Sequence, residues 1–119
     1  MSGSDQFQRE GKRSSMLIEV LYVPGCPNHQ PAVRRLRNAL RCEAVDVPIQ
    51  EIPITDEATA RSLRFPGSPT VRINGLDAEP NGHQSFGLAC RLYSGGNGLP
   101  SEETLQRAIC TAKNQEENI

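Results

Sequence analysis

The side chain of this sequence with the clearest capacity for chemistry is Cys26. It follows the dipeptide Pro24-Gly25, which interrupts an apolar run, and Pro27 then opens a helical pattern. This order predicts a strand, a tight turn, a cysteine and a helix starting at Pro27, because proline at the first helical position loses no hydrogen bond. Unpaired N–H groups and the helix dipole at that end favour a thiolate over a thiol. We therefore expect a reactive thiol, the alternative being a buried structural cysteine.

His29 follows Cys26 by three residues, which places it one turn along the predicted helix and on nearly the same face. From there it could stabilise the thiolate through a hydrogen bond or charge, or donate a proton to a leaving thiol. The alternative is a surface histidine without a chemical role. Helical spacing permits a contact with the sulfur but does not require one, so both interpretations stay open.

Length, charge and cysteine usage narrow the class of protein. The 119 residues suffice for one domain with its own core, and a net charge of -1 gives no field that would recruit nucleic acid or an acidic membrane. Neither a membrane-spanning apolar stretch nor a signal-peptide pattern is present, so we expect a cytoplasmic protein with no membrane partner. The spacing of the four cysteines matches no zinc finger and indicates separate thiols in a reducing compartment; they are Cys26, Cys42, Cys90 and Cys110. The oligomeric state is not indicated.

The pattern along the chain predicts one folded domain over residues 16–113, between a disordered head (1–15) and a frayed tail (114–119). Its expected strands are a central strand, an edge strand with two prolines, a strand ending in an Asn-Gly turn and a last strand paired with the third; they span 16–23, 47–54, 70–75 and 87–93. Its expected helices span 27–41, 55–64 and 101–113, the last two capped by Thr55 and Ser101. The fold class is therefore α/β, in the order β-α-β-α-β-β-α, with a mixed four-stranded sheet and helices on both faces.

A second motif, together with the predicted order of strands and helices, makes the sequence resemble a known family. Ser68-Pro69-Thr70 stands directly before the third predicted strand, with Pro69 43 residues after Cys26. The element order, the cysteine and this motif resemble the thioredoxin-like superfamily over residues 17–112. The sub-pattern is similar to small bacterial thioredoxin-family proteins of unassigned role, some of them loosely labelled alkylmercury-lyase-like. The resemblance implies a cis peptide bond at Pro69, facing Cys26, and a backbone at Ser68 that pairs with an extended thiol substrate.

The sequence departs from that superfamily at one decisive place. Where the family carries Cys-x-x-Cys, this chain has Cys26-Pro27-Asn28-His29, so a disulfide exchange between two cysteines of the motif is impossible. Two possibilities remain: a resolving cysteine elsewhere in the chain, or the chemistry of a monothiol thioredoxin- or glutaredoxin-like thiol–disulfide oxidoreductase. We expect the second, with a thiol or disulfide substrate or protein partner. It needs no resident cofactor, and glutathione or another external thiol would serve as co-substrate. The arginines of the first helix and the turn Ser94-Gly95-Gly96 could receive glutathione carboxylates, unless they are simply a solvated surface.

Two other functions stay open. Cys26, His29 and Cys90 together would suit a soft metal ion or an organomercurial, because thiolates prefer soft cations. Predicted pairing of the last strand places Cys90 away from Cys26, which favours a small core cysteine. The second alternative is a thioredoxin-like fold used only for protein interaction, without chemistry.

Overall fold

The computed structural model describes residues 16–80, 87–89, 91, 93 and 98–117. The predicted head, the Ser94-Gly95-Gly96 turn and Cys90 lie outside these residues. In the described part of the chain, seven elements follow one another in the order β-α-β-α-β-β-α, which confirms the predicted order. They are β1 (Ile18–Tyr22), α2 (His29–Cys42), β2 (Ile49–Pro53), α3 (Glu57–Ser62), β3 (Thr70–Ile73), β4 (Leu76–Asp77) and α4 (Glu102–Glu117).

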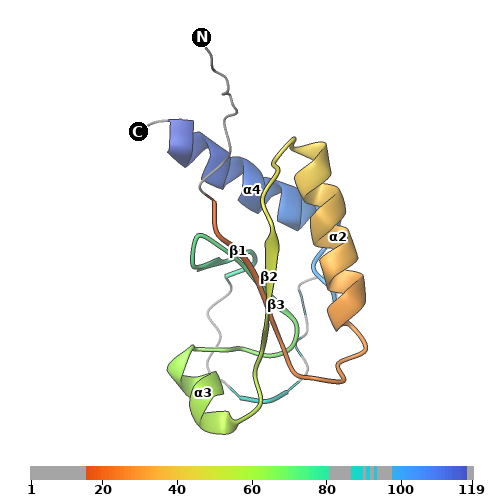
Figure 1. Ribbon diagram of the computed structural model, residues 1–119, viewed down its shortest axis with the longest axis vertical. Coiled ribbons are helices and arrows are strands. Elements are labelled where there is room, and N and C mark those ends of the chain that lie inside the picture. Colours follow the sequence, from red (N-terminus) through yellow and green to blue (C-terminus); the bar gives the residue numbers. More distant parts are fainter. Residues whose placement is uncertain (1–15, 81–86, 90, 92, 94–97, 118–119) are drawn as a thin grey trace.

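The four strands form one mixed sheet in the order β2-β1-β3-β4 (Figure 1). β1 runs parallel to β2 and antiparallel to β3, so that Ile18 lies opposite both Ile49 and Ile73. β3 and β4 are antiparallel. β2 lies at an edge, as its prolines predict, because proline cannot donate to a strand ladder. The predicted mixed four-stranded sheet is confirmed.

Side chains of β1 alternate between two hydrophobic clusters on opposite faces of the sheet. Ile18 and Val20 belong to the larger cluster, which also takes Leu36 from α2 and Ile109 from α4. Leu21 belongs to the smaller cluster, whose other buried members are Ile54, Ala60 and Phe65. Figure 1 shows α2 beside α4, with α3 at the other end of the molecule. Helices thus contribute to the core on both faces.

The fourth strand differs from the prediction of a strand over 87–93. Asn74 and Gly75 have φ values of 55° and 81°, the left-handed conformation of a two-residue hairpin turn. This turn reverses the chain at once, so the partner of β3 is Leu76–Asp77. The described residues of 87–93 form no strand. The turn motif was identified correctly, but the strand that follows it was placed too far along the chain.

Three helix boundaries also differ from expectation. α2 begins at His29 rather than Pro27, because the N–H of His29 closes a separate turn onto the carbonyl of Cys26 at 3.2 Å. α3 is capped by Asp56 rather than Thr55. α4 begins after the predicted cap Ser101, whose Oγ accepts from the N–H of Thr104 at 3.0 Å, and it continues to Glu117, through residues expected to fray.

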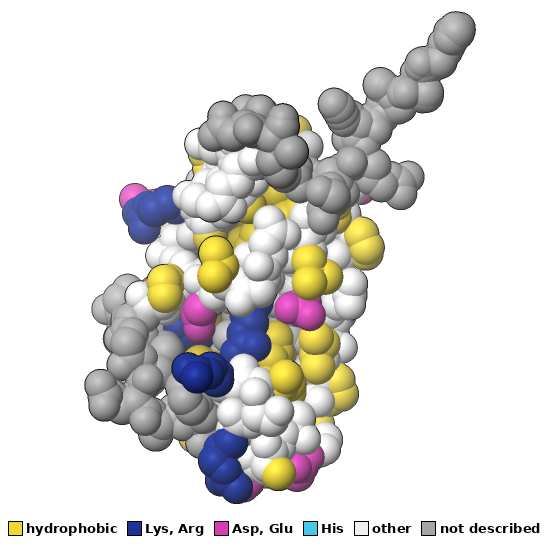
Figure 2. Space-filling view, turned by 90° about the vertical axis from the view of Figure 1, so that its left-hand side faces the viewer, with side chains coloured by type: hydrophobic (Ala, Val, Ile, Leu, Met, Phe, Trp, Pro, Cys, Tyr) yellow, Lys and Arg dark blue, Asp and Glu magenta, His cyan; other side chains and the backbone are white. Residues whose placement is uncertain are grey.

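Within the described residues, no helix has the length and apolar character needed to cross a membrane. The face shown in Figure 2 carries basic, acidic and hydrophobic side chains interspersed, without a broad patch of one charge.

The Asp56 cap makes the stability of α3 depend on pH. Hydrogen bonds from the side chain and backbone N–H of Thr59 lower the pKa of Asp56 from its ordinary value of 3.8. A lowered pKa in the folded state means that the stabilisation is present above pH 3.8 and is lost as the pH falls through the folded-state pKa. Asp56→Ala should therefore lower the urea midpoint at pH 7, and the deficit should shrink toward pH 3. The exposed control Asp46→Ala should change neither; a deficit that is independent of pH would contradict the charged cap.

Candidate functional site

The loop that carries Cys26 is built from two consecutive turns. Pro24 and Gly25, the latter with φ of 89°, occupy the centre of the first turn, which the N–H of Cys26 closes onto the carbonyl of Val23 at 3.0 Å. Proline followed by a residue of positive φ is typical of a type II turn. The second turn leads through Pro27 into α2. Cys26 therefore lies between the end of β1 and the start of α2, partly exposed, and ahead of the helix rather than in its first turn.

The second motif lies directly against this loop. The Ser68–Pro69 peptide bond is cis, as expected, and Ser68 rather than Pro69 lines the groove described next. Ser68 is buried, and its Oγ accepts a hydrogen bond from the N–H of Val23 at 3.0 Å. A groove of about 240 Å³ is lined by residues 23–27, Ser68, Leu88 and Ala89. The structure thus brings Cys26 and Ser68 to one groove, although they are far apart in sequence.

The backbone of the Ser68–Pro69 loop is already paired with a later part of the chain. The N–H of Ser68 donates to the carbonyl of Ala89 at 2.7 Å, and the N–H of Arg91 donates to the carbonyl of Ser68 at 3.0 Å. The hydroxyl of Tyr93 donates to the carbonyl of Pro69. The Ser68 backbone, expected to pair with an extended substrate, is therefore occupied by residues 89 and 91. A substrate could pair with it only by displacing them.

Thr70, the third residue of the motif, makes hydrogen bonds inside the protein and does not contact the groove. It is fully buried, its hydroxyl donates to the carbonyl of Gly67 at 2.6 Å, and it accepts from Arg91 at 3.2 Å. Thr70 does not line the groove. Gly67 has φ of 139°, and a Cβ there would meet the Cβ of Arg91 at 3.0 Å, so this position requires glycine.

Sequence reasoning missed Arg91, the largest fully buried side chain. Its guanidinium makes a bidentate ion pair with Asp77, at 2.8 and 3.0 Å, and donates to the carbonyl of Glu79 at 2.8 Å. It also lies over the ring of Tyr93, 4.2 Å from the centroid. Burial raises the pKa of the Tyr93 phenol. The signal that could have indicated this network is a single arginine inside an apolar run.

The ring of His29 contacts Glu51 and Tyr22, and not the sulfur of Cys26 as the predicted role would require. Its Nε2 lies 2.6 Å from Oε1 of Glu51 on β2, and its ring stacks on Tyr22 with centroids 3.6 Å apart and planes 7° from parallel. Among the described residues, no hydrogen bond joins its ring to the sulfur of Cys26. Glu51 was not identified from the sequence, because only the strand register places it beside α2.

The remaining cysteines do not complete a metal site in the described residues. No group of three His, Cys, Asp or Glu side chains there is arranged to hold a metal ion. Cys42 and Cys110 are exposed, and Cys90 is outside the described residues.

Comparison of the chain with protein-family models, curated proteins and solved structures gave no match.

The hydrogen bond from Val23 to Ser68 links the two loops of the groove. Ser68→Ala leaves a part-buried N–H without its partner, which should lower the free energy of unfolding by about 1–2 kcal/mol. Urea unfolding of the variant and of the exposed control Ser62→Ala measures the difference. Equal midpoints for the two variants would show that this bond contributes nothing to the link.

The contacts of His29 predict a role in stability. His29→Ala removes both the stacked ring and the hydrogen bond, and should cost about 1–2 kcal/mol of unfolding free energy. With Glu51→Ala and the double variant, urea unfolding completes a thermodynamic cycle, in which residues in contact give a coupling of about 0.5 kcal/mol or more. Strict additivity would mean that the pair carries no interaction energy.

Proposed function

We propose that this chain is a thioredoxin-like monothiol thiol–disulfide oxidoreductase with Cys26 as its nucleophile. The observation that carries the proposal is the groove in which Cys26 and Ser68, at the cis-proline loop, meet. The sheet order β2-β1-β3-β4 supports it, with the cysteine between β1 and the next helix and the cis proline directly before β3. This arrangement is the one expected of the superfamily that the sequence resembles.

The reaction follows from a single reactive sulfur. The Cys26 thiolate attacks one sulfur of a disulfide R–S–S–R′; a Cys26–S–S–R bond forms, the original S–S bond breaks, and R′–S⁻ leaves and takes a proton from water. An external thiol then attacks the sulfur of R, forming a new disulfide and releasing the Cys26 thiolate. These two steps release R′ as a free thiol and leave R in a disulfide with the external thiol. A second equivalent of external thiol then attacks that disulfide and releases R–SH, so that the substrate disulfide is reduced and two external thiols are oxidised to one disulfide. No second cysteine of this chain is needed.

His29 enters this proposal as a positioning residue. It is the first residue of α2, its N–H binds the carbonyl of Cys26, and its ring is fixed by Tyr22 and Glu51. It thereby connects the cysteine loop to β1 and β2. A direct proton transfer between His29 and the sulfur has no support in the described contacts.

Mass spectrometry of mixed-disulfide formation tests the proposal. The protein is treated with 2-hydroxyethyl disulfide, and adducts are followed at each cysteine, with exposed Cys42 and Cys110 as internal controls. Cys26 should react faster than Cys110 although it is less exposed, and dithiothreitol should remove the adduct. Catalysed reduction of the disulfide by dithiothreitol, above the uncatalysed rate, should be lost in Cys26→Ser and retained in Cys110→Ser. A Cys26 that forms adducts no faster than Cys110 would overturn the proposal and leave the non-catalytic alternative.

A further inference from the structure

The lining of the Cys26 groove carries no charge. The five residues of the cysteine loop are uncharged, Leu88 and Ala89 are apolar, and the Ser68 hydroxyl is engaged with Val23. The internal residues outside the described ones (81–86, 90, 92 and 94–97) contain no Lys, Arg, Asp or Glu in the sequence. A charged substrate group brought into this groove would lose water without gaining an oppositely charged partner in the described lining, which is unfavourable.

Two carboxylates contact residues in or beside the lining, while the guanidinium of nearby Arg91 is buried and paired with Asp77. Oε2 of Glu57 accepts a hydrogen bond from the N–H of Leu88 at 3.3 Å, next to the groove. Glu51 contacts the ring of His29, whose N–H donates to the carbonyl of Cys26. Glu57 is paired with Arg61 at 3.9 Å and Glu51 with His29 at 2.6 Å, and neither carboxylate can bind an anionic group of a substrate.

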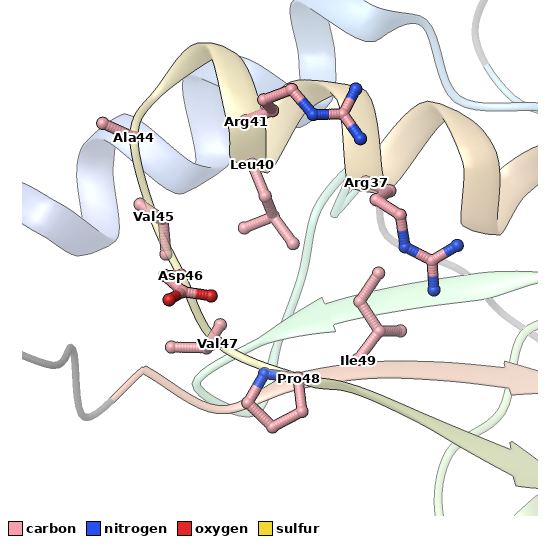
Figure 3. Close-up of a pocket in the computed structure, with 9 residues that line it drawn as sticks. All are labelled: Arg37, Leu40, Arg41, Ala44, Val45, Asp46, Val47, Pro48 and Ile49. Carbon is pink, nitrogen blue, oxygen red and sulfur yellow. The ribbon is translucent and has the colours of Figure 1, made fainter.

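The basic side chains of α2 belong to a different place. Arg37 and Arg41 line a separate cavity of about 510 Å³ between α2 and the segment before β2, where Figure 3 shows them above Leu40 and Ile49. Arg37 lies eight residues beyond the first residue of α2, about 12 Å along the helix axis. Arg35 donates to the carbonyl of Pro100 at 2.9 Å. None of the arginines of α2 lines the Cys26 groove.

We propose that the groove selects a thiol or disulfide whose group next to the sulfur is small, uncharged and apolar, and that it disfavours glutathione. The volume of about 240 Å³ supports this, because it lies below the range of typical ligand pockets, roughly 300–1,000 Å³. The inference rests on the proposed function and specifies the substrate class of the same site. A glutathione substrate would bring two carboxylates to a place where no basic side chain of the described lining receives them.

Three methanethiosulfonate reagents test whether the groove selects for an uncharged substrate. They react in the same way and release the same leaving group, but the groups that they transfer differ in charge. In each, the thiolate attacks the sulfur that bears the transferred group, a mixed disulfide forms and methanesulfinate leaves. The reagents transfer a methylthio, a 2-sulfonatoethylthio or a 2-(trimethylammonio)ethylthio group. Mass spectrometry of the full chain gives the rate at Cys26 relative to exposed Cys110 for each.

We expect the ratio of the Cys26 rate to the Cys110 rate to be highest for the methyl reagent and lowest for the sulfonate, with roughly a tenfold difference between them, since 1.4 kcal/mol of discrimination gives that factor. Equal ratios for the methyl and sulfonate reagents, or a preference for the sulfonate, would overturn the selection while leaving the proposed function intact. Failure of Cys26 to react faster than Cys110 with any of the three would instead count against the proposed function.

A variant with one added charge provides the matched control. Ala89 lines the groove and its side chain is exposed, so Ala89→Arg places a guanidinium at the entrance without disturbing the core. It should raise the ratio of the sulfonate rate to the methyl rate at Cys26 several-fold, as expected for electrostatic attraction. Ala89→Gln, of similar length but neutral, should leave this ratio at its wild-type value, and comparing the two variants removes any effect of the side chain's bulk on both rates. An equal response from both variants would show that size rather than charge controls access.

Discussion

The buried ion pair between Arg91 and Asp77 is the interaction on which the groove depends. The side chain of Arg91 is 1% exposed and that of Asp77 is 17% exposed, so the charge of each needs the other. Removing one partner of such a pair typically costs about 3–5 kcal/mol. The ion pair binds the side chain of Arg91 to Asp77 of β4, and the N–H of Arg91 donates a hydrogen bond to the carbonyl of Ser68. Ala89 and Arg91 are therefore held against the cis-proline loop, and Leu88 and Ala89 form one wall of the groove.

This anchoring determines how a substrate can be recognised. A substrate backbone could pair with Ser68 only after the hydrogen bonds that join Ser68 to Ala89 and Arg91 are broken. Breaking them would also disturb the buried position of the Arg91 guanidinium. The open route to Cys26 is the groove itself, where side-chain size and charge are the properties that the lining can distinguish. The ion pair between Arg91 and Asp77 thus has two consequences: it keeps Ala89 and Arg91 bound to Ser68, and it leaves the groove as the route by which a substrate is recognised.

Local patterns predicted what local interactions decide. The apolar run around β1, the Asn74-Gly75 turn and the Ser101 cap each depend on residues close in sequence, and each is found. The run 87–93 has the same apolar character as a strand, yet its described part is fixed by Arg91 and Asp77, fourteen residues apart. Periodicity carries no information about such a pair.

The site divides in the same way. The resemblance to the thioredoxin-like superfamily implied that the Ser68–Pro69 loop faces Cys26, whereas nothing in the sequence indicated the partner of His29. The contact with Glu51 requires the parallel register in which Glu51 lies beside Val20, and no short-range spacing gives that register. Cys26 and His29 would share a helix face only if one helix contained both, but α2 begins at His29 itself.

The arginines of α2 show that basic residues in a sequence indicate an anionic substrate only if the structure places them at the binding site. Arg41 lies in the last turn of the helix, where a cation is stabilised by the negative end of the dipole. Its guanidinium also donates to Asn38 at 3.0 Å, and that of Arg35 is bound to the Pro100 carbonyl. Helix electrostatics and these contacts account for Arg41 and Arg35 without an anionic substrate. The uncharged groove lies at the opposite end of the same helix, so the properties of the substrate must be inferred from the groove and not from the net basicity of α2.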